Sequence, residues 1–405
     1  LRYEVYAFDT SVRTAWLDGE RGFFNGTSLL LRVHGQEQAA HELTVHAPPQ
    51  RRDWQLATAM TPVQVDARGF GRYRADDYDE LVDHPVELGA FWSGHFKAGG
   101  VPHRFVVAGA PAAFDGERLL RDTQKICEAA IRLWHGAKAP PHRRYLFMLN
   151  AVGDGYGGLE HRASTALICG RHELPRHDSP ASAAQVGEGY VTLLGLISHE
   201  YFHAWNVKRL KPAEFAPYDF TRENYTRLLW FFEGFTSYYD DLALARSGVI
   251  DEAAYLTLAA KNLTQVQKGP GRLRQSVAES SFDAWIKYYR PDENSANAVV
   301  SYYTKGAAIA LGLDLKLRQT SGGTASLDDV LRLLWRRHGQ TGVGVAEDGI
   351  FAAVAEVGGA GVARWLRARV EAAEELDLAP LFKAMGVELI WETPAKAPTL
   401  GIKLE

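Results

Sequence analysis

The residues best suited to chemistry in this chain are His199, Glu200 and His203, which form an HExxH motif within an apolar segment. Residues four positions apart share one face of an α-helix, so both imidazoles can bind the same metal ion while Glu200 faces a water molecule on the open side. The apolar residues around the motif predict a buried helix: Leu193, Leu194, Leu196, Ile197, Tyr201, Phe202 and Trp205. The motif therefore predicts a zinc hydrolase. The alternative, two core histidines without a metal, would leave Glu200 buried without a partner, at a cost of several kcal/mol.

A catalytic zinc ion usually takes three protein ligands and keeps a fourth position for water, so a third ligand is expected elsewhere. The candidate is Glu233, about thirty residues beyond His203 in the aromatic, predicted helical segment 229–239. The alternative for this glutamate is a solvated position on a helix surface. Its aromatic neighbours argue against that alternative: they are Trp230, Phe231, Phe232 and Phe235. We interpret Asp240 and Asp241 as solvated helix acids, with a hydrogen bond to a zinc-bound histidine as the alternative.

Three separated motifs, in this order along the chain, resemble the glycyl aminopeptidase family of gluzincin zinc metallopeptidases, whose members carry a C-terminal PDZ domain. The motifs are Gly-Gly-Leu-Glu-His over 157–161, His-Glu-Tyr-Phe-His-Ala-Trp-Asn-Val-Lys-Arg over 199–209, and Ser-Tyr-Tyr-Thr-Lys-Gly over 301–306. The resemblance covers nearly the whole chain. It implies an α+β multidomain fold with an N-terminal all-β domain, a thermolysin-like zinc catalytic domain and a C-terminal helical domain, and one zinc ion per chain.

The resemblance also assigns substrate-binding roles to Gly157, Gly158 and Glu160. In related aminopeptidases the acid of this motif holds the free α-ammonium of the substrate, and glycines let the peptide backbone approach closely. Glu160 would then make the protein an aminopeptidase. Without the metal motif, the same residues would indicate a plain turn. Leu159 and His161 replace the commoner Met and Asn, which leaves the contribution of His161 open.

Tyr303 matches the tyrosine of the family whose phenol donates a hydrogen bond to the oxygen that becomes negatively charged when water attacks the carbonyl. A donor of this kind contributes about 3 kcal/mol to transition-state stabilisation. Tyr302 is an alternative donor, and both residues could instead be core aromatics. We expect a structural or solvent-facing role for Lys305 rather than a catalytic one.

These residues together predict an aminopeptidase that removes small N-terminal residues, glycine or alanine by family analogy, from peptides with a free N-terminus. Glu200 would act as general base, and the His-His-Glu ligand set favours zinc over magnesium or calcium. One alternative is a zinc endopeptidase, which Glu160 argues against because an internal peptide bond offers it no ammonium. Another is a catalytically silent peptide-binding module, which would not need the complete set of residues.

The composition is that of a soluble enzyme rather than a nucleic-acid-binding or membrane-spanning protein. The 405 residues contain 45 Lys and Arg against 49 Asp and Glu, with no basic run and no stretch of eighteen or more apolar residues. Cys127 and Cys169 lie in apolar surroundings and are expected to be buried structural residues. Two cysteines do not distinguish cytoplasm from periplasm, and nothing indicates the oligomeric state. Because the sequence starts at Leu1 without a signal-like segment, we expect any targeting peptide to have been removed or not represented.

The pattern along the chain predicts four parts. Residues 1–110 are β-rich, with alternating segments at 28–33, 64–73 and 104–107. Residues 111–250 form the catalytic domain, with a helix over 118–134 and a strand over 144–150. Residues 251–390 form a helical domain with a long loop over 269–297 and a capping box formed by Ser326 and Asp329. Residues 391–405, with Pro394 and Pro398, are expected to be a linker toward an absent PDZ domain.

Overall fold

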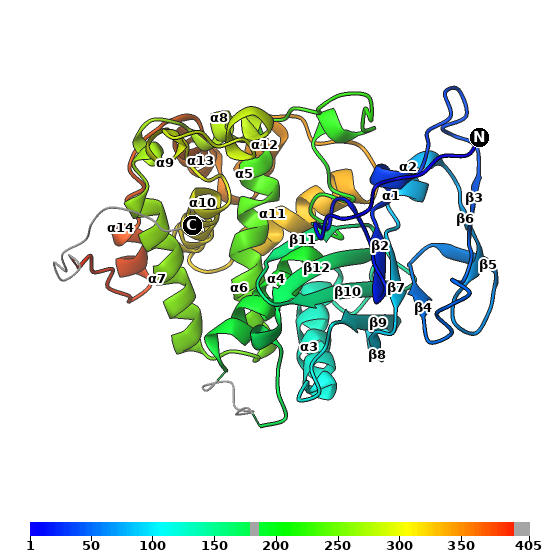
Figure 1. The fold of residues 1–405 in the computed structure, drawn as a ribbon. Helices are drawn as coiled ribbons and strands as arrows, with labels where there is room; N and C mark the ends of the chain where they lie inside the picture. The colour runs from blue at the N-terminus through cyan, green and yellow to red at the C-terminus, as the bar shows by residue number, and fades with distance from the viewer. Residues whose placement is uncertain (179–185, 393–405) are drawn as a thin grey trace.

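The computed structural model describes residues 1–178 and 186–392 (Figure 1). Its N-terminal region contains a four-stranded antiparallel sheet in the order β1-β2-β7-β4 and a three-stranded antiparallel sheet in the order β3-β6-β5. The elements of this region are β1 (Ala15–Leu17), β2 (Arg21–Phe24), α1 (Gly26–Leu29), β3 (His41–Val45), β4 (Gln55–Ala57), β5 (Thr61–Val65), β6 (Gly71–Ala75), α2 (Tyr78–Val82) and β7 (Val86–Gly89). The two sheets share a core that includes Trp54, Met60 and Val86.

A five-stranded sheet follows, with the strand order β11-β12-β10-β9-β8. Its strands are β8 (Trp92–Ala98), β9 (Val101–Ala108), β10 (Tyr145–Val152), β11 (Gly157–Glu160) and β12 (Ser164–Gly170). The central strand β10 runs parallel to β9 and β12, whereas the outer strands β8 and β11 are antiparallel to their neighbours. Residues 92–108 therefore belong to the same sheet as β10, and a domain boundary at residue 110 would fall after two strands of that sheet.

The two faces of this sheet meet different partners. Along β10, Phe147 and Leu149 pack with Leu193 and Ile197 of the metal-motif helix α4 (Glu188–Phe202) and with α3 (Gly116–His135). The alternate residues Leu146 and Met148 pack with Ala57 and Phe91 instead. Because successive strand residues point to opposite faces, helices cover one face and the N-terminal region covers the other.

The remaining structure is helical and forms the opposite half of the molecule (Figure 1). Its α-helices are α5 (Leu229–Phe232), α6 (Gly234–Ser247), α7 (Glu252–Lys268), α8 (Val277–Phe282), α9 (Ser295–Ala298), α10 (Thr304–Ser321), α11 (Leu327–Leu334), α12 (Gly349–Gly358), α13 (Ala360–Glu371) and α14 (Ala379–Ala384). Short 3₁₀ segments lie at η1 (Arg171–Glu173), η3 (Ala213–Phe215) and η4 (Pro270–Leu273), and π-helical turns at η5 (Ala284–Tyr288) and η6 (Trp335–Gly339). Helix α6 packs against both α4 and α10.

Most of the expected elements are confirmed. The predicted helix over 118–134 is α3, the predicted strand over 144–150 is β10, and an N-terminal β region precedes a helical C-terminal region. The Asp329 carboxylate accepts hydrogen bonds from the backbone N–H and hydroxyl of Ser326, which confirms that capping box. Cys127 and Cys169 are fully buried and not joined in a disulfide, as expected.

Three expectations were wrong. Residues 64–73 are not one continuous strand, because they include the end of β5, a turn over 66–70 and the start of β6. Residues 28–33 do not form a strand, because the Asn25 side chain accepts a hydrogen bond from the Thr27 backbone N–H and starts helix α1 there. Residues 269–297 are not one long loop but a series of short helices, which a capping box between Ser276 and Glu279 helps to start. Of the expected linker over 391–405, residues 393–405 lie outside the described residues, including Pro394 and Pro398. No helix in the described ranges is both long and apolar enough to span a bilayer.

Buried histidines behind the metal-motif helix give folding a pH dependence. His103 is 1% exposed, and its ring nitrogens contact the Val101 carbonyl and the Tyr201 hydroxyl at 2.9 Å each. Burial lowers the pKa of His103 to about 4, so the folded protein keeps it neutral where an unfolded chain takes up a proton. This stability is complete above pH 6.5 and is lost as the pH falls toward 4, by about 3 kcal/mol in total.

We therefore expect the melting temperature to fall between pH 7 and pH 5, and to fall less steeply in His103→Gln. Thermal unfolding followed by circular dichroism at several pH values measures this. His46→Gln, at an exposed strand-end position, is the matched control and should retain the wild-type slope. An unchanged slope in His103→Gln would contradict the assignment.

Candidate metal centre

Three side chains from two parts of the chain converge at the end of α4. His199 lies in the last turn of this helix and His203 immediately after it, and their Nε2 atoms are 3.0 Å apart. Glu233 joins α5 to α6, and its Oε2 lies 3.4 Å from Nε2 of His199 and 3.2 Å from Nε2 of His203. A tetrahedral zinc ion with bonds of about 2.0–2.1 Å holds its ligand atoms about 3.3 Å apart. The three atoms therefore fit one such ion, and in the described part of the chain no other His, Cys, Asp or Glu group is arranged to hold a metal.

Both histidines are oriented by hydrogen bonds from their other ring nitrogen. Nδ1 of His199 lies 2.8 Å from Oδ2 of Asp240, and Nδ1 of His203 lies 2.6 Å from the backbone carbonyl oxygen of Asn206. Each contact places the ring proton on Nδ1 and leaves the Nε2 lone pair free for a metal, which is how metal-binding histidines are commonly held.

Our interpretation of Asp240 as a solvated acid was wrong, and the contact with His199 that its alternative required is present. Asp240 lies two helical turns after Glu233 on α6, and only 15% of its side chain is exposed. Its neighbour Asp241 is not a freely solvated acid either, since burial and the charge of Asp240 raise its pKa to about 8. The seven-residue spacing from Glu233 was a sequence signal that placed Asp240 on the same helix face.

Glu200 is buried and Glu233 is partly buried, but their electrostatic environments differ. Burial acts to raise the pKa of Glu233, but when both histidines also carry a proton on Nε2, the charge of His203 and hydrogen bonds from both rings hold it well below its usual range. A metal ion bound at Nε2 would take the place of those protons. Burial raises the pKa of Glu200 to about 7 against the opposing effect of the same histidines. Oε2 of Glu200 has no hydrogen-bonding partner within the described ranges. A buried, unpartnered carboxylate oxygen beside three ligand atoms fits a site built around a metal and its water.

The Gly157–Glu160 segment forms β11, which is an edge strand of the five-stranded sheet. No described strand pairs with its outer edge. An added Cβ at Gly157 would meet open space, whereas one at Gly158 would collide with the Glu200 carboxylate. Glycine at 158 therefore lets the strand lie directly against Glu200. The Glu160 carboxylate, at the end of the strand, accepts no hydrogen bond from the residues described. It borders a cavity of about 290 Å³ that Leu159, Lys208 and Tyr218 also line.

The role of His161, left open by the sequence, is to bind Asp83, the residue that ends helix α2. Nδ1 of His161 lies 3.2 Å from Oδ1 of Asp83. The same carboxylate accepts hydrogen bonds from the backbone and guanidinium of Arg162 and lies 2.7 Å from Nζ of Lys208. Burial opposes ionisation, but these cations, with Lys208 contributing most, hold the pKa of Asp83 well below its usual range. Sequence reasoning missed this ion-pair network, which joins the N-terminal region to the end of β11.

Tyr303 lies at the start of α10, with its ring centroid 6.3 Å from that of His199 and its hydroxyl 3.1 Å from that of Tyr289. Burial and the charge of Glu233 raise the pKa of Tyr303 well above its usual value, so its phenol keeps its proton. Tyr302 is 1% exposed and stacks on Tyr303. Lys305 is buried and donates hydrogen bonds to the carbonyl oxygens of Arg272 and Glu374, which confirms a structural role.

Comparison with known proteins gives matches to both family models and solved structures. A model described as M61 glycyl aminopeptidase matches residues 192–309, and one described as Peptidase M61 N-terminal domain matches residues 1–90. A solved aminopeptidase N family protein from Idiomarina loihiensis is 43% identical, with a TM-score of 0.90, over 94% of this chain and 63% of that protein. The chain thus spans less than two thirds of that relative. No curated protein matches the sequence.

More distant structures share the fold. An M1 zinc metallopeptidase from Deinococcus radiodurans is 16% identical, with a TM-score of 0.56, over 93% of this chain and 75% of that one. A mutant of the M1 enzyme from Deinococcus radiodurans bound to a Tyr-Ser-Ala substrate gives a TM-score of 0.57 at the same identity and coverage. At this identity the likeness establishes the fold alone.

Removing the Asp240 carboxylate should weaken metal binding without removing a ligand. We expect Asp240→Asn to lower zinc affinity by about 10- to 100-fold, because His199 loses the acceptor that fixes its ring. Competition with a chromogenic chelator measures this. Asp241→Asn is the matched control, since Asp241 contacts neither histidine, and equal losses in both variants would show that the effect is not specific to the His199 contact.

Proposed function

The chain belongs to the M61 glycyl aminopeptidase family, and on that premise we propose that it is a zinc-dependent aminopeptidase that removes glycine or alanine from the free N-terminus of peptides. The observation that carries the proposal is the unpartnered Glu160 carboxylate beside the metal centre. It lies close enough to raise the pKa values of both Glu200 and His203. No described cation contacts this carboxylate directly, because Lys208, which lines the same cavity, pairs with Asp83. This supports a role for Glu160 in binding the ammonium group of a substrate.

Strand β11 supplies the rest of the substrate-binding geometry in this proposal. A peptide added antiparallel to its open edge would place its N-terminus at Glu160 and continue past Gly157 toward Tyr156. Glu160 then holds the ammonium, and the glycines leave room for the peptide backbone. An internal peptide bond would present no ammonium to Glu160, which favours an aminopeptidase over an endopeptidase.

His199, His203 and Glu233 would hold the zinc ion, which lowers the pKa of a bound water to about 7 and polarises a carbonyl group. Glu200 accepts a proton from the attacking water as its oxygen bonds to the carbonyl carbon. The same carboxyl group passes that proton to the departing amine as the C–N bond breaks. Tyr303 donates a hydrogen bond to the carbonyl oxygen as it gains negative charge. Burial of Glu200 supports this role, because a pKa of about 7 suits a group that both accepts and returns a proton.

We further propose that the catalytic unit is thermolysin-like, built on the sheet β8–β12 with the metal centre between α4 and α6. The preceding β-rich unit is then better ended near residue 90 than at 110, because β8 and β9 pair with β10 and the N-terminal family model stops at 90. The helical unit over 251–390 contributes Tyr303 from α10.

Hydrolysis of a glycyl chromogenic amide tests the proposal. The zinc-loaded protein should cleave the free amine and not its N-acetylated form, because acetylation removes the charge that Glu160 binds. Glu160→Gln should lower kcat/KM for the free amine by about 100-fold, the usual scale for removing one member of a buried charge pair. Equal cleavage of both substrates would contradict the aminopeptidase and favour an endopeptidase, and cleavage of neither would favour a silent peptide-binding module.

Tyrosine substitutions test the source of the hydrogen bond to the carbonyl oxygen. We expect Tyr303→Phe to lower kcat by about 100- to 1000-fold with little change in KM, since the bond strengthens in the transition state. Tyr302→Phe is the matched control and should have a small effect, because its side chain is enclosed in the core. A larger loss in Tyr302→Phe would assign the role to Tyr302.

A further inference from the structure

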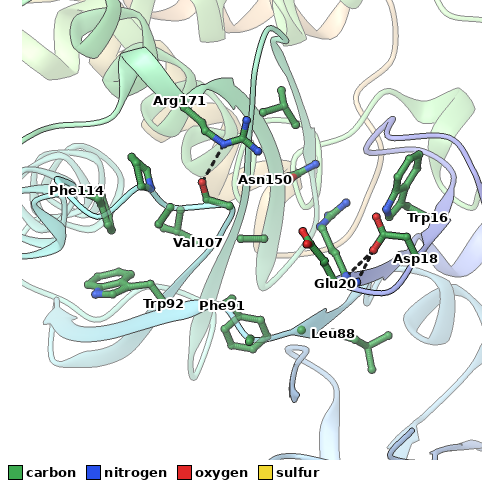
Figure 2. Close-up of a pocket in the computed structure, with 18 of the residues that line it drawn as sticks. Trp16, Asp18, Glu20, Leu88, Phe91, Trp92, Val107, Phe114, Asn150 and Arg171 are labelled. Atoms are coloured by element: carbon green, nitrogen blue, oxygen red, sulfur yellow. Dashed lines mark hydrogen bonds between the residues drawn. The ribbon is translucent and has the colours of Figure 1, made fainter. Parts of the chain in front are cut away.

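The structure contains a cavity of about 670 Å³ that none of the metal-centre residues lines (Figure 2). It lies where the four-stranded N-terminal sheet meets the carboxyl ends of β9 and β10, and its walls include Leu88 and Phe91 on one side and Val107 and Asn150 on the other. The volume is within the range of about 300–1,000 Å³ that is typical of small-molecule sites.

Asn150 is an unexpected residue at this position of β10. It shares a sheet face with Leu146 and Met148, which are packed in an apolar cluster, and it is 7% exposed. Its side-chain amide nevertheless makes no hydrogen bond to any residue of the described chain. The amide group opens onto the cavity rather than being enclosed in the core, so its hydrogen-bonding partners must come from whatever fills the cavity. Because a side-chain amide both donates and accepts hydrogen bonds, the Asn150 amide fits a ligand that supplies both a donor and an acceptor, as a peptide group does.

Charges of opposite sign stand on different sides of Asn150 (Figure 2). Arg171 uses its Nε to donate to the Gly109 carbonyl oxygen at 3.1 Å, and its two terminal nitrogens have no partner among the described residues. Across the cavity, the exposed Glu20 carboxylate has no partner among the described residues, and the exposed Asp18 accepts hydrogen bonds from the backbone N–H groups of Glu20 and Arg21. Arg21 and Arg51 also line the cavity, but their guanidinium groups pair with Glu87 and Asp53. One wall can therefore bind a carboxylate and the other an ammonium.

From these features we propose that the cavity is a second binding site, for a zwitterionic peptide of two or three residues. Arg171 binds its terminal carboxylate, Glu20 and Asp18 its ammonium, and Asn150 a peptide group, while Phe91 and Trp92 contact an apolar side chain. The site is distinct from the metal centre, because Asn150 faces the N-terminal region whereas α4 packs on the opposite face of β10.

Peptide binding to the Glu200→Gln protein tests this proposal, because that substitution removes the catalytic base and the peptide remains intact. Isothermal titration with Leu-Gly-Gly should show binding that persists after the further change Glu160→Gln, which removes the anchoring group of the metal cleft. Arg171→Ala should weaken this remaining binding at least 10-fold. N-acetylation or C-terminal amidation of the peptide should each weaken it to a similar extent. These experiments need no catalytic activity, so their outcome is independent of the proposed aminopeptidase reaction.

Two further variants make the result specific. Arg176→Ala removes a nearby arginine that pairs with Asp178 and does not line the cavity, and it should leave binding unchanged. Asn150→Leu should abolish the binding and raise the melting temperature, because an apolar side chain suits the neighbouring cluster. Peptide binding that disappears with Glu160→Gln, or that is unaffected by both Arg171→Ala and Asn150→Leu, would overturn the proposal and leave the cavity as a water-filled junction.

Discussion

The close approach of α6 to α10 is the contact on which the metal centre depends. An added Cβ at Gly234 would collide with the backbone of Gly306, and one at Gly306 would collide with that of Trp230. Glu233 immediately precedes the first of these glycines and Tyr303 lies one turn before the second. The two glycines thus set the distance between the segment that carries the third candidate ligand and the helix that carries the phenol. A side chain at either position would separate these groups even if every polar residue were retained.

A second constraint comes from the N-terminal region. The buried Asp83, whose side chain is 6% exposed, binds His161, Arg162 and Lys208, so three donors from the catalytic part of the chain are tied to one carboxylate. Buried ion pairs contribute little net stability unless their geometry is satisfied, but removing one partner is strongly destabilising because it leaves the other charge buried and unpaired. The N-terminal region is therefore more than a scaffold beside the sheet, because its Asp83 fixes the residues that directly follow Glu160.

The sequence was most informative where a local rule determined the geometry. The four-residue spacing of His199 and His203 requires only a helix, and the aromatic neighbours of Glu233 were enough to indicate burial. Asp240 was misjudged because adjacent acids usually indicate solvent. Its seven-residue spacing from Glu233 placed it on the same helix face, but the packing of α6 on α4 is needed to show that this face meets His199. Asp83 had no local signal, since its partners lie about 80 residues or more away along the chain. At residues 28–33, a side-chain cap at Asn25 outweighed the alternating pattern.

The open edge of β11 has a consequence for the physical state of any polypeptide that binds there. Pairing with a strand edge requires several consecutive residues to be extended and to have free backbone groups. The end of a folded domain satisfies neither condition until it frays. A peptide that pairs with β11 would therefore be selected first by its lack of folded structure and only then by its side chains. The backbone hydrogen bonds of a stably folded domain would keep it from binding there.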